Sequence, residues 1–464
     1  MPCQASSTLK AGMIFPILMV CSGCATPTIK DSVKITPITV ASSSLRGGRL
    51  LGGDGLDWGS AIASRDDGSY ALFGYTWKSF GESTDLFVAS YGPDDELLWA
   101  NTYGGTHKEY LDCGILTRDG GYLLSGSSQS LFFTAMKVFS PDRQSRPIVI
   151  KLNSLGAVEW AMTIDNSRIA LNDVIQMKDG TYLFVGGCRE SFESDTWDIC
   201  SIKVSSQGGV LWASTYDGNP IDIALGVRED VDSSAVIAGY TTADRGSANL
   251  LLMKIDRNGQ PLWGTTYEAE KHQLPTAMMS FPDGTYAVTG FSGEQGGAEK
   301  DMFVARVSGD GQLTWYQLYG SPERDEAWSI LKGHGADVLV VGRTGMPEQG
   351  QEDGTALLIG SDGSLKAAAL VQGHLNDELM AVALDARDGY FLFGDTESFS
   401  ASYVDQILLR WAPGASQTTA PFSQRALDAK VVSLHVNHLH LEIRPNDITS
   451  QVETKQLSLR RTGK

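Results

Sequence analysis

The chain of 464 residues lacks the patterns that identify several large classes of protein. Its body has no long segment with helical periodicity, which excludes helical bundles and helical repeats. It has no excess of basic residues: the formal net charge is −18, and such acidity repels nucleic acid and argues against general DNA or RNA binding. The apolar run at residues 11–20 is too short to span a bilayer permanently. What remains is a globular protein whose hydrophobic content of 42% suffices for a core.

The familiar catalytic and metal-binding spacings are absent as well. The sequence contains no HExxH motif, no GxSxG nucleophile turn, no phosphate-binding P-loop and no repeated Asp loop for calcium. These absences predict a protein without a bound cofactor, and they weigh against an enzyme.

Cysteine is scarce in the body of the chain. Of six cysteines, Cys3, Cys21 and Cys24 lie at the N-terminus. Cys188 and Cys200 flank a loop between two apparent strands. We expect a disulfide across that hairpin, and two free thiols are the alternative.

The N-terminus has the order of a targeting segment. Lys10 precedes the apolar run, and Ser22, Gly23 and Cys24 follow it. This order resembles the bacterial lipoprotein signal, in which small residues precede a lipidated cysteine, although Cys21 stands where that signal usually has Leu. The resemblance implies a signal peptide over residues 1–23, a lipid on Cys24 and a linker over 24–43. We therefore expect an exported protein anchored in the bacterial envelope (outer membrane, periplasm or cell surface), with an ordinary cleaved signal as the alternative.

One stretch of sequence recurs along the chain. Residues 254–267 read KIDRNGQPLWGTTY, and relatives stand at 151–160, 203–216 and 308–319, with a worn copy at 91–105. The tryptophans of these copies are Trp99, Trp160, Trp212, Trp263 and Trp315. Most steps between them are about fifty residues, a period that is typical of a propeller, a solenoid or an array.

Four pieces appear in the same order in each repeat. A short strand opens after an acidic residue, a second follows an Asp-Gly turn, a third follows a loop, and a fourth carries the tryptophan. Seven such units predict an all-β fold, a seven-bladed β-propeller of four-stranded antiparallel blades over residues 44–414; they begin near Asp57, Glu109, Ile169, Asp222, Gln273, Asp325 and Asp377. The seventh unit lacks a fourth strand. We expect residues 46–51 to complete it and close the ring, which removes exposed edges.

The turn glycines and the tryptophans have a fixed spacing. In four units a glycine precedes the tryptophan by four positions: Gly156 and Trp160, Gly208 and Trp212, Gly259 and Trp263, Gly311 and Trp315. Over residues 44–412 the chain thus resembles bacterial β-propeller repeat proteins of the quinoprotein-like kind, in which such a tryptophan packs between blades. The resemblance implies structural blade tryptophans rather than a sugar-binding aromatic ring. It implies no cofactor site, because Asp256 lies three residues before Gly259, where the superfamily has Asp four before.

Acidic residues occupy equivalent places at the start of five innermost strands. They are Asp57, Glu109, Asp222, Asp325 and Asp377, with Gln273 and Ala170 in the other two units. In a propeller they surround one mouth of the central channel and offer a candidate binding face for a cation or a basic partner. Alternatively, each satisfies backbone groups of its own connecting loop.

The loop between the second and third strands of the second unit carries an insertion. Its apolar residues Phe132, Phe133, Met136 and Phe139 make it the best candidate for a binding epitope. The alternative is a loop that packs on itself over the ring.

The chain changes in character after residue 414. Residues 415–464 form a basic extension with seven Lys or Arg against four acids. His438 and His440 share one face of a possible strand, and they are weak metal candidates because no acid or Cys completes a ligand set. We expect the extension to dock on the acidic propeller or to act as a partner-binding strand.

Together these features predict a non-catalytic binding platform. The expected protein is a lipid-anchored, monomeric propeller that holds a protein or envelope component on the face of the acidic ring and the insertion. The competing class is an enzyme, either a quinoprotein-like oxidoreductase or a polysaccharide-active propeller. A deep pocket with convergent polar groups and shifted pKa values at the channel mouth favours the enzyme, whereas a shallow face favours the platform.

Overall fold

The computed structural model describes the body of the chain and parts of its C-terminal extension. The described residues are 44–412 except 52–55, 78–83, 105–107, 130–145, 165–168, 190–195, 218–220, 243–247, 270, 295–296, 298, 322, 347–350, 372–373, 388 and 400–403, together with 444–447, 454–456 and 460–463. Within these residues no helix is long and apolar enough to cross a bilayer.

The first four blades follow the chain in order. Blade 1 consists of β2 (Leu56–Ser64), β3 (Tyr70–Trp77), β4 (Thr84–Tyr91) and β5 (Leu97–Gly104). Blade 2 consists of β6 (Glu109–Leu116), β7 (Tyr122–Ser128), β8 (Arg146–Leu152) and β9 (Val158–Ile164). Blade 3 consists of β10 (Ile169–Gln176), β11 (Tyr182–Cys188), β12 (Asp198–Val204) and β13 (Val210–Asp217). Blade 4 consists of β14 (Asp222–Glu229), β15 (Ala235–Thr242), β16 (Ala248–Ile255) and β17 (Pro261–Tyr267).

Three blades complete the set. Blade 5 consists of β18 (His272–Ser280), β19 (Tyr286–Gly293), β20 (Lys300–Val307) and β21 (Leu313–Tyr319). Blade 6 consists of β22 (Asp325–Lys332), β23 (Val338–Met346), β24 (Gln351–Ile359) and β25 (Leu365–Val371). Blade 7 consists of β26 (Asp377–Asp385), β27 (Gly389–Thr396), β28 (Asp405–Ala412) and, as its outermost member, β1 (Ser44–Leu51).

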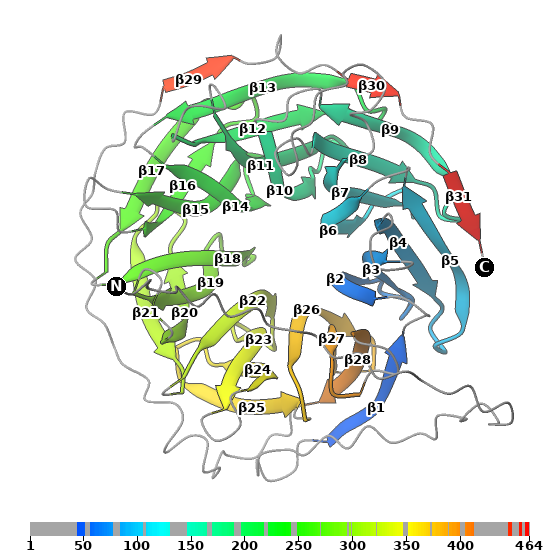
Figure 1. Cartoon of the computed structure of the whole chain (residues 1–464). Coiled ribbons are helices and arrows are strands. Elements are labelled where there is room, and N and C mark those ends of the chain that lie inside the picture. The colour runs from blue at the N-terminus through cyan, green and yellow to red at the C-terminus, as the bar shows by residue number, and fades with distance from the viewer. Residues whose placement is uncertain are drawn as a thin grey trace, which may run out of the picture. The chain divides into compact units, whose positions relative to one another are not determined.

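The seven sheets form a closed ring (Figure 1). Innermost strands of neighbouring blades contact each other from blade to blade, until β26 of the last blade meets β2 of the first. The predicted seven-bladed β-propeller of four-stranded antiparallel blades is therefore confirmed. The predicted closure is also confirmed, because β1 pairs antiparallel with β28 from Ser44 opposite Ala412 to Leu51 opposite Gln406.

The described parts of the C-terminal extension add outer strands to three blades. In Figure 1, β29 (Arg444–Asp447), β30 (Thr454–Gln456) and β31 (Arg460–Gly463) lie outside β13, β9 and β5. The extension thus passes blades 3, 2 and 1 in that order, and it covers part of each outer edge with backbone pairing.

The hydrophobic core lies between blades rather than within one. One cluster joins Val236 and Leu252 of blade 4 to Val288 and Phe303 of blade 5. Similar clusters connect the other neighbouring blades. Because each sheet buries both faces against its neighbours, a blade depends on the ring for its stability.

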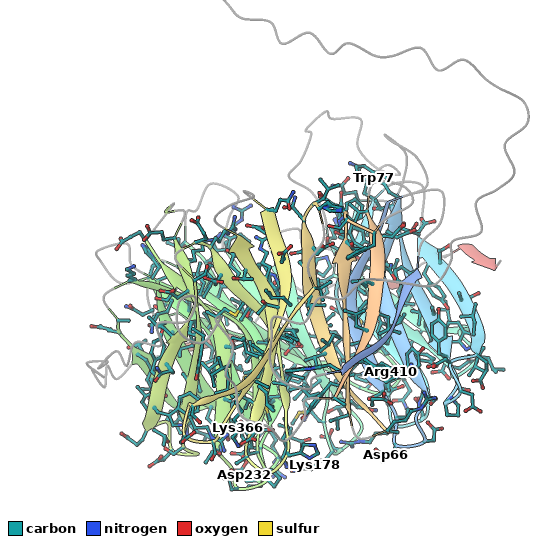
Figure 2. All side chains as sticks on the ribbon, turned by 90° about the horizontal axis from the view of Figure 1, so that it is seen from below. Asp66, Trp77, Lys178, Asp232, Lys366 and Arg410 are labelled. Carbon is teal, nitrogen blue, oxygen red and sulfur yellow. The ribbon has the colours of Figure 1, made fainter. Side chains whose placement is uncertain are left out.

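The blades have two ends of different character. At what we call the hairpin end, tight turns such as residues 65–69 and 92–96 join the first strand to the second and the third to the fourth. At the mouth end, the innermost strands begin and the second strands finish. In Figure 2, Trp77 lies at the mouth end, whereas Asp66, Lys178, Asp232 and Lys366 lie at the hairpin end.

Candidate functional site

The five repeat tryptophans lie at joints between blades. A Cβ on Gly208, in the outer hairpin of blade 3, would lie 2.9 Å from the ring of Trp160 on blade 2, so glycine is needed there. Trp160 Nε1–H also donates to Ser206 O at 3.0 Å. The other pairs are Trp99 with Gly156, Trp212 with Gly259, Trp263 with Gly311 and Trp315 with Gly363. These tryptophans dock one blade on the next and do not form a ligand-binding ring.

A tyrosine four residues after the tryptophan completes most of these joints. Tyr103 Oη donates to Gly156 O at 2.7 Å. The same bond joins Tyr216 to Gly259, Tyr267 to Gly311 and Tyr319 to Gly363. This role was not predicted from the sequence, although the WxxxY spacing recurs in the repeats. In the structure each of these buried tyrosine hydroxyls donates to a carbonyl.

The five acidic residues expected around the channel mouth are buried. Their relative exposures are 7% for Asp57, 1% for Glu109, 2% for Asp222, 2% for Asp325 and 1% for Asp377. Strand register sets each opposite a hydroxyl residue of the second strand: Thr76, Ser128, Thr241, Thr344 and Thr396. They do not form an open face, because each of these side chains is buried.

Asp325 shows how such a carboxylate is held. It accepts hydrogen bonds from the Thr344 hydroxyl and from Ser321 N–H, the latter at 2.6 Å, and so ties the connection between blades 5 and 6 to the start of β22. Burial nevertheless raises the pKa of Asp325 to about 7. The bonds show the alternative role, satisfaction of a connecting loop.

Cys188 and Cys200 are buried free thiols and not the expected disulfide. Across β11 and β12, Cys188 pairs with Asp198 and Cys200 with Gly186, so the two cysteines are diagonal neighbours. Diagonal Cα atoms lie about 7–8 Å apart, beyond the span of about 4.4–6.8 Å that a disulfide bridges. Cys188 pairs with Ile169 on its other side. Ile169, and not Ala170, is therefore the blade 3 counterpart of the acidic residues.

Every innermost strand carries a β-bulge three residues after its acidic position. The bulged residues, which we call the bulge ring, are Ser60, Asp112, Asn172, Leu225, Thr276, Trp328 and Met380. A bulge bends its strand and re-aims the side chain of the extra residue. All members except Trp328 line a single cavity on the propeller axis. These residues were not predicted from the sequence, because nothing in the hydrophobic alternation marks a bulge.

The axial cavity has a volume of about 490 Å³, which suits a small molecule. Besides the bulge ring, its lining includes Trp58 and Tyr75 of blade 1 and Glu378 and Asp395 of blade 7. The cavity therefore combines aromatic, carboxyl, amide and hydroxyl groups from different blades, and it is the candidate site.

Trp58 and Tyr75 line one side of the cavity. Trp77 and Tyr110 pack against these two rings outside that lining, and we call the four residues together the aromatic wall. Trp58 and Tyr75 are cross-strand partners, and their rings stack at 5.3 Å and 22°. Trp77 lies 6.0 Å from Trp58, and Tyr110 meets Tyr75 edge-on at 5.4 Å. The Lys108 ammonium lies 5.1 Å from the ring centre of Trp77, so one ring of the wall already receives a cation.

Three carboxyl groups, the acidic trio of Asp112, Glu378 and Asp395, share the cavity with this wall. Asp112 is open to channel water, yet protein surrounds it, and that burial raises its pKa to about 7. Burial also raises the pKa of Glu378 and holds that of Asp395 well above its usual range. Asp395 accepts Gly59 N–H at 2.7 Å. The pKa of Tyr75 is raised by burial and, to a smaller extent, by the charges of all three carboxylates.

Three cations near the mouth, Lys300, Arg324 and Arg343, belong to an ion-pair cluster on blades 5 and 6. Glu326 bonds Lys300 at 2.6 Å, Arg343 at 2.5 Å and Arg324 at 2.9 Å. Arg343 also bonds Glu352 at 2.7 Å and reaches Glu378 only at 3.5 Å. Burial raises the pKa of Glu326, but these cations bring it below its ordinary value.

A smaller apolar cavity of about 270 Å³ lies between blades 4 and 5. Tyr240, Leu274 and Phe291 contribute to its apolar lining. Its polar groups come from Thr242, His272, Glu294 and Lys300. His272 Nδ1 accepts Ala248 N–H at 3.0 Å, so its other nitrogen carries the proton when the ring is neutral.

Several predicted site residues lie outside the described residues: Cys24, Phe132, Phe133, Phe139, His438 and His440. Among the described residues, no group of three or more His, Cys, Asp or Glu side chains is arranged to hold a metal ion.

Comparison with known proteins adds little beyond the fold. No protein-family model and no curated protein matches the chain. A solved protein of unknown function from Dyadobacter fermentans is 11% identical over 80% of this chain and 100% of its own, with a TM-score of 0.45. The β-propeller domain of the Trilobed protease from Pyrococcus furiosus is 10% identical over 79% and 97%, at 0.42, and a glucose dehydrogenase is 11% identical over 80% and 99%, at 0.38. Likenesses this distant carry no argument, so fold and site rest on strand register and side chains.

Proposed function

We propose that this protein is an envelope-anchored binding protein whose axial channel holds a small ligand. The observation that carries the proposal is the cavity of about 490 Å³, with the aromatic wall on one side and the acidic trio beside it. A cavity in which polar groups converge differs from the shallow contact face that the sequence favoured, and it leaves an enzyme as the second candidate. The binding surface therefore moves from the loops and the acidic ring to the axis of the propeller.

Anchoring in the envelope is part of the proposal and is supported by the sequence. Lys10, the apolar run at residues 11–20 and Ser22-Gly23-Cys24 have the order of a lipoprotein signal. A propeller held by a lipid would act as a monomer beside the membrane and meet protein or envelope-component partners there. Metabolic labelling with an alkyne fatty acid tests this: Cys24→Ser should lose the label and Cys21→Ser should keep it. Label retained on Cys24→Ser would refute the anchor.

Ligand retention by the channel can be measured directly. The purified protein would be incubated with a small-molecule extract of envelope material and analysed by native mass spectrometry. Ser60→Trp, which places a large ring in the bulge ring, should abolish any bound mass. Asp66→Asn, an exposed change at the hairpin end, should leave it unchanged. If the wild type, Ser60→Trp and Asp66→Asn all retain the same bound mass, and both variants keep the melting temperature of the wild type, channel binding is refuted.

An enzyme is the second candidate, and one observation favours it. Burial raises the pKa of Asp112 to about 7, the range in which a carboxyl group exchanges protons near neutral pH. The same incubation separates the two classes, because a binding protein returns its ligand unaltered. A compound that is chemically changed by the wild type and unchanged by Asp112→Asn would establish an enzyme instead.

A further inference from the structure

Resting on the proposed function, we infer that the axial channel selects an organic ammonium ion. The site consists of Trp58 and Tyr75 from the aromatic wall, which offer aromatic rings, and the acidic trio, which offers negative charge when ionised, around one cavity. The ligand class is thus a compact alkylammonium, such as a quaternary amine, with an apolar surface around its positive charge.

The first argument is the charge balance of the cavity. In the part of the chain that the structure describes, no Lys or Arg lies within ion-pair distance of Asp112 or Asp395, and no cation lowers their pKa values. Glu378 has only the 3.5 Å contact with Arg343, whose shorter bonds go to Glu326 and Glu352. A cation in the cavity would relieve carboxylates that the fold itself leaves without a close counter-charge.

The second argument is the geometry of the aromatic wall. Trp58 and Tyr75 lie in the cavity lining together with the acidic trio. Aromatic faces attract cations through their quadrupole, and they attract alkylated ammonium ions most readily because these are weakly hydrated. Lys108 over Trp77 is an internal example of the same interaction in the same wall.

The third argument concerns the kind of cation. A bare metal ion needs several oxygen or nitrogen ligands at short range, and the described residues contain no group of three His, Cys, Asp or Glu so arranged. Glu378 and Asp395 are cross-strand partners on blade 7, whereas Asp112 stands on blade 2, so an ion that meets all three carboxyl groups has to bridge two blades. A cavity of about 490 Å³ also exceeds the needs of a metal ion.

A matched pair of probes tests the inference. Choline and 3,3-dimethylbutan-1-ol have the same shape, and they differ in that the quaternary nitrogen of choline is a neutral carbon in the alcohol. Calorimetric titration of the full-length protein at pH 8 and low salt should show choline binding at least about tenfold more tightly than the alcohol. Maltotriose, a neutral sugar, is the third probe.

Variants locate the binding site. Glu378→Gln and Asp112→Asn should each lower the affinity for choline about tenfold while leaving the affinity for the alcohol unchanged. Trp58→Leu should lower the affinity for choline about tenfold or more. Asp66→Asn, exposed at the hairpin end, is the control that should bind like the wild type. Melting temperatures identify any variant that fails to fold. If Trp58→Leu fails to fold, Glu378→Gln takes its place as the test of the site.

The outcomes separate this inference from the function on which it rests. Equal binding of choline and the alcohol would show that charge plays no part, and choline binding unaffected by Glu378→Gln and Asp112→Asn would place the ion elsewhere; either result overturns the inference. Maltotriose binding that Ser60→Trp abolishes, without choline binding, would overturn it while sustaining a ligand-binding channel. If no probe binds and Ser60→Trp retains the same extract compounds as the wild type, both proposals fail.

Discussion

The two ends of the blades differ in how far they repeat. At the hairpin end, most blades carry the same ion pair between the third strand and the inner turn: Lys151 with Asp119, Lys203 with Asp179, Lys254 with Asp232, and Arg306 with Asp283. At the mouth end, the equivalent cross-strand pair between the first and second strands differs from blade to blade. It is Trp58 and Tyr75 in blade 1, Ala170 and Gly187 in blade 3, and Glu378 and Asp395 in blade 7. Chemistry that every blade repeats maintains the ring, and chemistry that varies between blades is available for a ligand.

Apart from Glu326, whose pKa its cations hold below the ordinary value, the carboxyl groups with shifted pKa values at the two ends are shifted in opposite directions. At the hairpin end, the Ser234 hydroxyl, with further help from Lys254, lowers the pKa of Asp232 to about 2. On the mouth side, burial raises the pKa of Asp325 to about 7 and that of Asp112 to about 7. One end is thus stabilised by ionised carboxylates, and the other buries carboxyl groups at a cost in free energy.

The hairpin end departs from its own pattern where the ring closes. The fourth strand of blade 7 is β1, so no outer hairpin follows β28, and blade 6 has Ala367 in the place of the docking tryptophan. We call the joint between blade 7 and blade 1 the seam. On its blade 1 side, the outer turn has Asp95 with φ 66° where the other outer turns have glycine. Arg410 bonds Asp95 Oδ2 at 2.9 Å and Asp385 at 2.8 Å. An ionic contact therefore replaces the tryptophan joint at the seam.

The largest effect is expected from breaking this seam. Arg410→Met leaves Asp95 and Asp385 without their common cation, and their side chains are only 10% and 7% exposed. Removing one partner of a buried pair costs about 3–5 kcal/mol. Lys366→Met at the same end removes a pair whose lysine is 47% exposed, and should cost less than about 1 kcal/mol. Urea unfolding measures both, and similar losses would contradict a special role for the seam.

A tryptophan joint should be nearly as sensitive. Gly259 has φ +81° and a Cβ there would lie 2.9 Å from Trp212, whereas Gly284 has φ +78° with nothing within 4 Å. Left-handed strain alone costs roughly 1 kcal/mol for alanine, and displacing a packed ring adds about 1–2 kcal/mol. Gly259→Ala should therefore lose about 2–3 kcal/mol and Gly284→Ala about 1 kcal/mol. Equal losses in thermal or urea unfolding would show that the tryptophan contact contributes nothing.

The features that every blade repeats could be predicted from the sequence, whereas those that vary between blades could not. Recurring Asp-Gly turns, the Gly-to-Trp spacing and the missing fourth strand of the last unit led to the blades and to the closure by β1, because repeated local signals add up. The sequence left open whether the acidic ring forms a binding face or satisfies its own loops, since a position in a repeat does not show whether the side chain is buried, as all five are. Asp112 and Trp58 were missed as site residues because they meet Glu378 only through ring closure, across more than half of the chain.

The opposite pKa shifts predict opposite pH dependences. Asp325 is buried and its folded pKa of about 7 exceeds its value of 3.8 in the unfolded chain, so its stabilising contribution is complete below pH 3.8 and is lost as pH rises through 7. The slope reaches at most about 1.4 kcal/mol per pH unit. Asp325→Asn should flatten the decline in unfolding free energy between pH 4 and 7.

The matching control is at the hairpin end. Although burial raises it, hydrogen bonds from Lys151 and Thr117 hold the pKa of Asp119 at about 2, below 3.8. Its contribution is present above pH 3.8 and is lost as pH falls through 2. Asp119→Asn should therefore alter stability relative to wild type above pH 4 and leave the slope between pH 4 and 7 unchanged. A changed slope there would contradict the assignment of the two ends.

The smallest effect is expected from the C-terminal extension, which belongs to neither end. Deleting residues 444–464 removes β29, β30 and β31 from the outer edges of β13, β9 and β5. Each backbone hydrogen bond contributes about 0.5–1.5 kcal/mol, and ordering each residue costs about 1–2 kcal/mol, so the net change in unfolding free energy should stay below about 1 kcal/mol. Hydrogen exchange gives the sharper measurement: amides on the outer edges of β5 and β13 should exchange faster after deletion, whereas β17 and β21, which carry no added strand in the described structure, should not change. Unchanged exchange at β5 and β13 would mean that the extension does not pair with the blades in solution.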